Sequence, residues 1–146
     1  MTGLPSGSSG PASVAIREVG ARDGLQSEDP VPVADRVLLV EALLAAGVTV
    51  LEVGAFVSPK AVPAMAGSDE VFAAVPAAEG VTRVALVPNA RGAELALAAG
   101  AEALTVTVSA SAAYNERNVR MSIDESVASI ATICALAHQA DVPVDA

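Results

Sequence analysis

Residues Leu43–Val53 read LLAAGVTVLEV, and residues Leu95–Val108 read LALAAGAEALTVTV, with the same features in the same order. Each stretch has the end of a helix, a glycine and then a nearly continuous apolar run. Gly47 and Gly100 both follow Ala-Ala, at the place where the residue after a helix adopts a positive φ. Strands that read as continuous apolar runs are typical of parallel sheets covered by helices. This weak internal repeat predicts an α/β fold of alternating strands and helices.

The same alternation continues outward from these two stretches. Five short runs rich in apolar and β-branched residues are predicted as strands: Val14–Val19, Thr49–Val53, Arg83–Val87, Leu104–Val108 and Val142–Asp145. Between them, the spacing of apolar residues predicts helices over Val33–Ala46, Asp69–Val75, Arg91–Ala99 and Ile123–Gln139.

The helix signals are specific in the first and last of these segments. Ser122 and Glu125 form the pattern of a capping box, in which each side chain satisfies a free N–H group at the helix start. Apolar residues recur at helical spacing in both segments and give each helix one face to bury. These residues are Val33, Val37, Val40 and Leu44, followed by Val127, Ile130, Cys134 and Ala137.

Two architectures fit this alternation, an open doubly wound sheet and a (βα)8 barrel. A dinucleotide-binding open sheet requires G-x-G-x-x-G in its first turn, and residues Gly20–Gly24 do not supply it. Glu18 and Glu52 each lie inside an apolar strand and precede Val-Gly, and we interpret them as a matched pair of acids at a barrel mouth. A complete barrel needs about 250 residues. Four βα units and the start of a fifth strand therefore predict about half of a (βα)8 barrel.

Composition excludes several classes of protein. The 146 residues are 53% hydrophobic and 2% aromatic, with a mean hydropathy of +0.53. Disordered chains lack this much apolar surface. No uncharged apolar run approaches the roughly 18–20 residues of a membrane-spanning helix. We expect a soluble protein with a flexible Gly/Ser/Pro-rich leader over Met1–Ala12 and one partial barrel domain over residues 13–146.

Charge and cysteine content narrow the partners and the compartment. Eight Lys+Arg against 17 Asp+Glu give a net charge of −9, which argues against nucleic acid as a partner. The single Cys134 cannot form an internal disulfide, and Met1–Ser13 lacks the basic and apolar regions of a signal peptide. A cytoplasmic location is therefore expected.

Polar residues follow each predicted strand, where parallel α/β folds carry their active sites. The four clusters are Arg22-Asp23-Gly24, Ser58-Pro59-Lys60, Pro88-Asn89, and Ser109 with Ser111, Tyr114 and Asn115. The first cluster is the most informative. Arg22 can stabilise a developing enolate, and Asp23 can bind a hard divalent cation. The alternative for this dipeptide alone is a surface ion pair.

Three segments carry a resemblance to a known family: EVGARDGLQSE from Glu18, LEVGAFVSPKAVPAM from Leu51 and LVPNARGAELALAAGAE from Leu86. In this order they closely resemble the 3-hydroxy-3-methylglutaryl-CoA lyases, and the resemblance implies the amino-terminal half of a TIM barrel. Those enzymes belong to the metal-dependent TIM-barrel lyases and acyl-CoA condensing enzymes that share the Arg-Asp-Gly motif. The resemblance extends from about Val14 to Ala146, and the Phe56–Lys60 segment is more specific to the lyase branch than the Arg-Asp-Gly motif.

The resemblance implies cleavage of a C–C bond that gives acetyl-CoA and acetoacetate, with Mg²⁺ or Mn²⁺ holding substrate oxygens. It implies that Asp23 is a metal ligand and that Arg22 binds substrate and stabilises the enolate oxygen. Glu52 would act beside substrate and metal by polarising groups or relaying protons, and Gln26 would support the substrate site. An acyl-CoA partner and a place in leucine degradation follow from the same resemblance.

The remaining ligands of the family, a His-x-His pair and an Asn, and its late catalytic Cys are not found here. His138 is expected at a helix end and Cys134 in the core, both structural. The isolated chain is therefore expected to be truncated, inactive and prone to self-association. Two alternatives stay open: a related acyl-CoA condensing enzyme or pyruvate-linked aldolase, and a non-catalytic half-barrel.

Some residues keep two readings. Four basic residues would either contact CoA phosphates or lie on a solvated face: Lys60, Arg91, Arg117 and Arg120. Asn89 would either cap a helix or contact substrate. Glu18 would be either a structural partner of Arg22 or a catalytic group.

Overall fold

The computed structural model describes residues 14–146. The leader predicted over Met1–Ala12 lies outside the described residues. Four parallel strands form one sheet in the order β1-β2-β3-β4. The strands are β1 (Val50–Ala55), β2 (Thr82–Leu86), β3 (Ala103–Thr105) and β4 (Val144–Asp145). The predicted parallel α/β architecture is confirmed.

Five α-helices connect the strands. They are α1 (Val33–Ala45), α2 (Ser68–Ala74), α3 (Ala90–Ala98), α4 (Ala112–Val119) and α5 (Ile123–Gln139). Two short helical turns, Gly20–Gly24 and Pro63–Met65, complete the described elements. Four helices begin and end within one residue of the predicted ranges, and α4 was not predicted.

Local signals in the sequence determine several helix ends. Ser122 and Glu125 form the predicted capping box at the start of α5. Gly47 and Gly100 follow α1 and α3 with φ of 93° and 84°, a backbone conformation that side chains with a Cβ rarely adopt. Asn89 caps α3, because its side chain accepts a hydrogen bond from the N–H of Gly92 at 2.9 Å.

The prediction of a strand over Val14–Val19 is wrong in extent. Only Glu18 pairs with β1: its N–H donates to the carbonyl of Val50 at 2.9 Å, and its carbonyl accepts from the N–H of Glu52 at 2.8 Å. The chain turns away at Val19 before a second pair can form. One bridge therefore replaces the strand.

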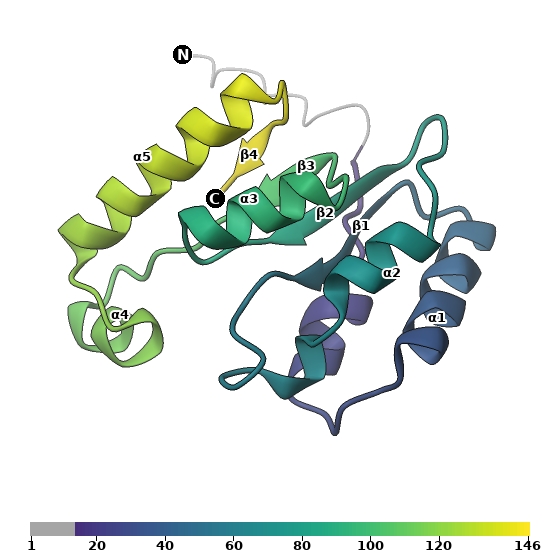
Figure 1. Cartoon of the computed structure of the whole chain (residues 1–146), viewed down its shortest axis with the longest axis horizontal. Coiled ribbons are helices and arrows are strands. Elements are labelled where there is room, and N and C mark those ends of the chain that lie inside the picture. Colours follow the sequence, from purple (N-terminus) through teal and green to yellow (C-terminus); the bar gives the residue numbers. More distant parts are fainter. Residues whose placement is uncertain (1–13) are drawn as a thin grey trace, which may run out of the picture.

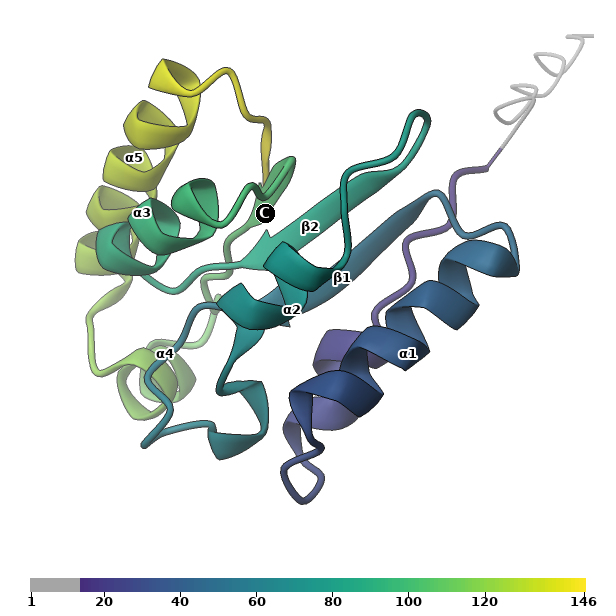
Figure 2. The same cartoon turned by 45° about the vertical axis from the view of Figure 1, so that its right-hand side comes forward.

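The hydrophobic core lies between the sheet and its helices, whose arrangement can be followed in Figures 1 and 2. Alternate strand residues face the helices, as the pleat of a strand requires. The strand residues in this core are Leu51, Val53, Ala85, Val87, Leu104 and Val106. The helices contribute Val40, Val71, Phe72, Ala93, Ala96, Ile133 and Ala137. The other face of the sheet carries Glu52 and Thr105.

The predicted apolar face of α5 is partly wrong. Cys134 is exposed and not a core residue, and Val127 is 54% exposed. The buried positions are instead Ser126, Ile133 and Ala137. Relative to the predicted face, Ser126 is buried in place of Val127, and Ile133 in place of Cys134.

Helix α4 depends on polar contacts, because its sequence offers no apolar stripe. Ser111 accepts a hydrogen bond from the N–H of Tyr114 at its start. Asn115 is buried, and its amide donates to the Ser126 hydroxyl at 2.7 Å and to the Met121 carbonyl at 2.9 Å. Asn115 therefore joins α4 to the start of α5 and has a structural role. None of the helices between residues 14 and 146 has the length and apolar character needed to cross a membrane.

Candidate functional site

A tight helical turn positions the Arg-Asp pair above the sheet. The carbonyl of Val19 accepts hydrogen bonds from the N–H groups of Arg22, Asp23 and Gly24 at 3.1, 2.7 and 3.3 Å. This turn follows the Glu18 bridge directly, so Arg22 and Asp23 lie between the first strand-like segment and α1. The predicted placement of these two residues after a strand-like segment is therefore correct.

Arg22 is held in place by carboxylates on two sides. Its Nε and Nη2 lie 2.6 and 2.5 Å from Oε2 of Glu52. Its Nη1 donates to Oδ1 of Asp23 at 2.6 Å and to Oε1 of Gln26 at 3.4 Å. Because charge-assisted bonds of this kind are short and directional, they fix the guanidinium plane. The structure thus brings together all four residues predicted for the site.

Glu52 is buried, with 3% of the residue exposed. Its second oxygen, Oε1, lies 3.5 Å from the hydroxyl of Thr105 and 3.7 Å from Nη1 of Arg17. Arg17 also donates to Thr105 at 3.2 Å and forms an ion pair with Asp145. These contacts compensate a carboxylate that burial alone would destabilise.

Glu18 is not the partner of Arg22, which corrects one of its two predicted readings. The Glu18 carboxylate accepts a hydrogen bond from the N–H of Gly20 at 2.5 Å. It is also only half-buried, whereas Glu52 is buried. The predicted matched pair of buried acids is therefore a single buried acid, because Glu52 lies on β1 between β2 and the Glu18 bridge, whereas Glu18 forms only that bridge.

An open cleft of about 790 Å³ lies at the carboxyl end of the sheet. Each predicted polar cluster contributes to its lining, as expected for a parallel α/β fold. The lining residues include Arg22, Asp23, Gln26, Ser58, Asn89 and Tyr114. Asn89 therefore caps α3 and also faces the cleft. Glu52 does not line the cleft, but it binds Arg22, which does.

Sequence reasoning missed several residues of this region. Asn118, Val119 and Met121 line the cleft because the unpredicted α4 lies at its edge. Arg17 and Thr105 meet Glu52 across the sheet, and only the pairing of β1, β2 and β3 brings them together. The alternation of residues along β3 was a signal that could have placed Thr105 on the face opposite the helices.

The four basic residues considered for CoA phosphates are not among the cleft-lining residues. Arg91 is exposed and pairs with Glu94 at 3.1 Å. Lys60 is exposed on the loop between β1 and Pro63–Met65. Contacts of Lys60, Arg91, Arg117 and Arg120 with CoA stay predictions.

Asp23 offers the chemistry of one ligand for a hard cation. Its side chain is 54% exposed, and its Oδ1 accepts a hydrogen bond from Nη1 of Arg22 at 2.6 Å. Within residues 14–146, no group of three His, Cys, Asp or Glu side chains could hold a metal ion. The described residues therefore do not complete a metal site.

Comparison with known proteins agrees with the observed fold. The family model described as HMGL-like matches residues 13–145. The 3-hydroxy-3-isohexenylglutaryl-CoA/hydroxy-methylglutaryl-CoA lyase of Pseudomonas aeruginosa is 47% identical over 135 residues, which are 92% of this chain and 45% of that protein. The hydroxymethylglutaryl-CoA lyase of Pseudomonas mevalonii is 45% identical over 133 residues, which are 90% of this chain and 44% of that protein.

Solved structures give the same result. The crystal structure of the Pseudomonas aeruginosa hydroxymethylglutaryl-CoA lyase superposes with a TM-score of 0.87, at 47% identity, over 92% of this chain and 45% of that one. The Acinetobacter baumannii HMG-CoA lyase, solved with coenzyme A and 3-methylmalate, gives a TM-score of 0.84 at 35% identity, over 89% of this chain and 43% of that one. The chain thus spans less than half the length of these relatives. The predicted amino-terminal half of a TIM barrel is confirmed.

Proposed function

The chain belongs to the HMGL-like family, and on this premise we propose that its cleft is the substrate site of a carbon–carbon lyase. The proposed reaction cleaves 3-hydroxy-3-methylglutaryl-CoA to acetyl-CoA and acetoacetate. The observation that carries the proposal is the fixed guanidinium of Arg22 at the cleft, clamped by Glu52 and Asp23. Relatives named hydroxymethylglutaryl-CoA lyase support the choice of substrate.

Arg22 would stabilise the enolate that forms on the thioester side as the C–C bond breaks. Its Nε and Nη2 point to Glu52 and its Nη1 to Asp23, so the cation is oriented before substrate arrives. A guanidinium has five N–H donors, and these contacts leave capacity for a substrate oxygen. Donors that are already in place stabilise developing charge without reorganising during the reaction.

Glu52 would serve this reaction mainly by orienting Arg22. Both of its oxygens have partners, Arg22 on one side and Thr105 with Arg17 on the other. A carboxylate in this setting holds a cation at a defined position. That Glu52 also relays a proton stays a prediction.

Asp23 would contribute one ligand to a divalent cation, Mg²⁺ or Mn²⁺, since carboxylate oxygen is the donor that both ions prefer. Such a cation stabilises negative charge on substrate oxygens. Gln26 would support Arg22 through its amide oxygen, 3.4 Å from Nη1.

We further propose a cytoplasmic protein of leucine degradation that self-associates. The exposed free Cys134 suits a reducing compartment, and exposed Val14 and Ile16 offer apolar surface for association. The alternative chemistries, acyl-CoA condensation and pyruvate-linked aldol cleavage, receive no better support from the relatives.

Calorimetric titration with 3-hydroxy-3-methylglutaryl-CoA in the presence of Mn²⁺ tests the proposal. Arg22→Met should weaken binding by about tenfold or more, because a hydrogen bond to a charged group is worth about 1.5–3 kcal/mol. Glu41→Gln is the control, since Glu41 is exposed on α1 and is not one of the cleft-lining residues. Equal affinity of wild type and Arg22→Met would overturn the assignment. Release of acetyl-CoA and acetoacetate, measured in parallel, separates binding from turnover.

A further inference from the structure

Arg36 on α1 is buried without an anionic partner. It is 1% exposed, and its burial lowers the pKa of the guanidinium. Its Nη1 donates to the carbonyl of Ala66 at 2.7 Å and its Nη2 to the hydroxyl of Ser68 at 3.1 Å. Its Nε has no hydrogen-bond partner. None of the ion pairs in the described part of the chain includes Arg36.

Arg83 shows what a more usual buried arginine looks like in the same fold. Arg83 is 5% exposed, but Glu102 lies 3.3 Å from its Nε. Its other nitrogens reach main-chain carbonyls, including that of Val75 at 2.6 Å. A buried cation without a carboxylate partner lowers the stability of the fold. A purely structural role therefore does not readily explain Arg36. All of its bonds go to one short segment, Ala66–Ser68.

The segment Ala66–Ser68 closely follows one side of the substrate cleft in the chain. We call that side of the cleft the cleft wall and define it as residues 57–63. Five of its residues line the cleft: Val57, Ser58, Ala61, Val62 and Pro63. The main-chain hydrogen bonds of the wall are local. The N–H groups of Ala61 and Val62 donate to the Ser58 carbonyl at 2.9 and 3.0 Å. Such bonds shape the loop but do not attach it to the sheet.

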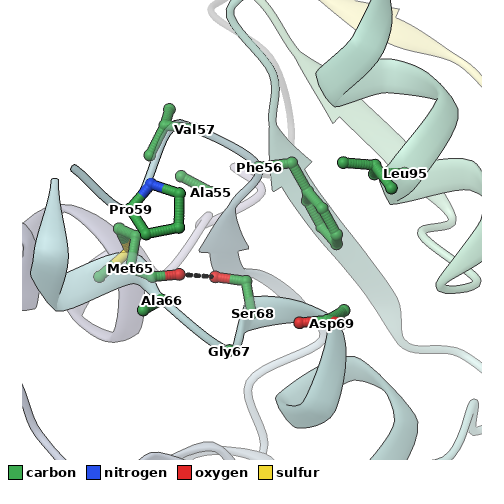
Figure 3. Close-up of a pocket in the computed structure, with 10 residues that line it drawn as sticks. All are labelled: Ala55, Phe56, Val57, Pro59, Met65, Ala66, Gly67, Ser68, Asp69 and Leu95. Atoms are coloured by element: carbon green, nitrogen blue, oxygen red, sulfur yellow. Dashed lines mark hydrogen bonds between the residues drawn. The ribbon is translucent and has the colours of Figure 1, made fainter. Parts of the chain in front are cut away.

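Arg36 attaches the segment that follows the wall, Ala66–Ser68, to α1. Ser68 accepts from Arg36 and donates to the carbonyl of Met65 at 2.8 Å, the bond drawn in Figure 3. Arg36 therefore fixes the main chain at Ala66 directly and at Met65 through Ser68. Strand β1 leaves room for these bonds at Gly54, where an added Cβ would lie 2.6 Å from the Ser68 hydroxyl and 3.2 Å from Nη2 of Arg36.

Packing holds part of the wall, because Val57 and Val62 lie against the buried Ala64 and Met65, but it leaves space beside the wall. A pocket of about 170 Å³ lies beside it (Figure 3) and is lined in part by Val57, Pro59, Met65 and Ala66. This space lies next to the segment that Arg36 holds. Loss of the guanidinium would leave this space open to a displaced wall.

We propose that Arg36 is a positioning residue that holds the cleft wall in place through Ala66 and Ser68. It sets the shape of the cleft without touching substrate. The inference rests on the proposed function only in taking this cleft as the substrate site.

The single lysine of the sequence makes the proposal testable, because Lys60 lies in the wall and is exposed. A lysine-specific protease cleaves the native chain only after Lys60. Arg36→Met should raise the rate of this cleavage about tenfold under native conditions, and Ser68→Ala by a smaller factor, since local opening controls cleavage. Ile133→Ala is the control, because it opens a cavity in the core contributed by α5, away from the wall.

The comparison is made at equal free energy of unfolding, measured in urea for each variant. Selective cleavage at Lys60 in the Arg36 and Ser68 variants supports positioning. Equal cleavage in the Ile133 variant would overturn it and leave Arg36 as a general stabilising residue. If Arg36→Met does not fold, Ser68→Ala alone decides, because it removes only hydroxyl contacts. The readout does not depend on catalysis, so failure to bind 3-hydroxy-3-methylglutaryl-CoA would count against the proposed function and not against this inference.

Discussion

Arg22 and Glu52 form a close ion pair across 30 residues of sequence, with Nη2 of the arginine 2.5 Å from Oε2 of the glutamate. The pair joins the turn after the Glu18 bridge to the middle of β1. It converts a flexible cation into a fixed one, and it links the stability of the sheet to the geometry of the cleft.

This pairing predicts strong energetic coupling between the two residues. Arg22→Met should lower the free energy of unfolding by about 2 kcal/mol, because it leaves a buried carboxylate with only Thr105 and Arg17 nearby. A double-mutant cycle with Glu52→Gln should give a coupling of about 1–3 kcal/mol in urea unfolding. Additive effects of the two substitutions would contradict a direct pair.

Asp23→Asn should weaken the binding of Mn²⁺, measured by electron paramagnetic resonance, because the amide removes a charged oxygen donor at the cleft. Asp29→Asn is a suitable control, since Asp29 is exposed and is not one of the cleft-lining residues. If both variants bind Mn²⁺ as the wild type does, Asp23 is not a ligand.

Gly54→Ala should destabilise the fold by about 1–3 kcal/mol, the usual effect of overpacking. Its Cβ would collide with the Ser68 hydroxyl at 2.6 Å and press against Arg36. Gly24→Ala is the matched control, because no atom lies within 4 Å of the added Cβ there. Urea unfolding should leave Gly24→Ala unchanged or slightly more stable. Equal stability of the two variants would contradict the close approach at Gly54.

The capping box of α5 predicts a pH dependence of stability. Hydrogen bonds from the N–H and then the hydroxyl of Ser122 lower the pKa of Glu125. A carboxyl whose folded pKa lies below its unfolded value stabilises the fold above the unfolded pKa, and this contribution is lost as the pH falls through the folded pKa. Protection factors for hydrogen exchange at the start of α5, which are corrected for the intrinsic pH dependence of exchange, should therefore fall on acidification. Glu125→Gln, which keeps an acceptor oxygen but does not titrate, should remove that part of the pH dependence. An unchanged pH profile in Glu125→Gln would contradict it.

Light scattering should show self-association of the chain. Val14 and Ile16 are 82% and 77% exposed, and residues 14–17 make no main-chain hydrogen bond within the described part of the chain. An unpaired apolar edge favours pairing with another chain. Ile16→Lys should shift the population towards monomer, whereas Leu38→Lys on the outer surface of α1 should not. A monodisperse wild-type monomer would contradict the prediction.

Local patterns in the sequence determined the alternation of strands and helices, the Ser122–Glu125 capping box, the glycine stops at Gly47 and Gly100, and the placement of Arg22 and Asp23 beside the cleft. These features depend on residues close together in the chain, so the order of residue types is sufficient to predict them. The resemblance to the lyases rested on the same contiguous segments.

Only the tertiary structure decided which partner each group has. Glu18 and Glu52 occur in nearly identical local sequences, yet Arg22 pairs with Glu52 because the turn after Val19 directs the guanidinium over β1. The exposure of Cys134 depends on how α5 is rotated against the core. Ile133 is buried in its place, whereas Ala137 is buried as predicted. The buried network of Arg36 joins α1 to a segment about thirty residues away. Contacts across such separations depend on packing and register, which no local pattern of residues encodes.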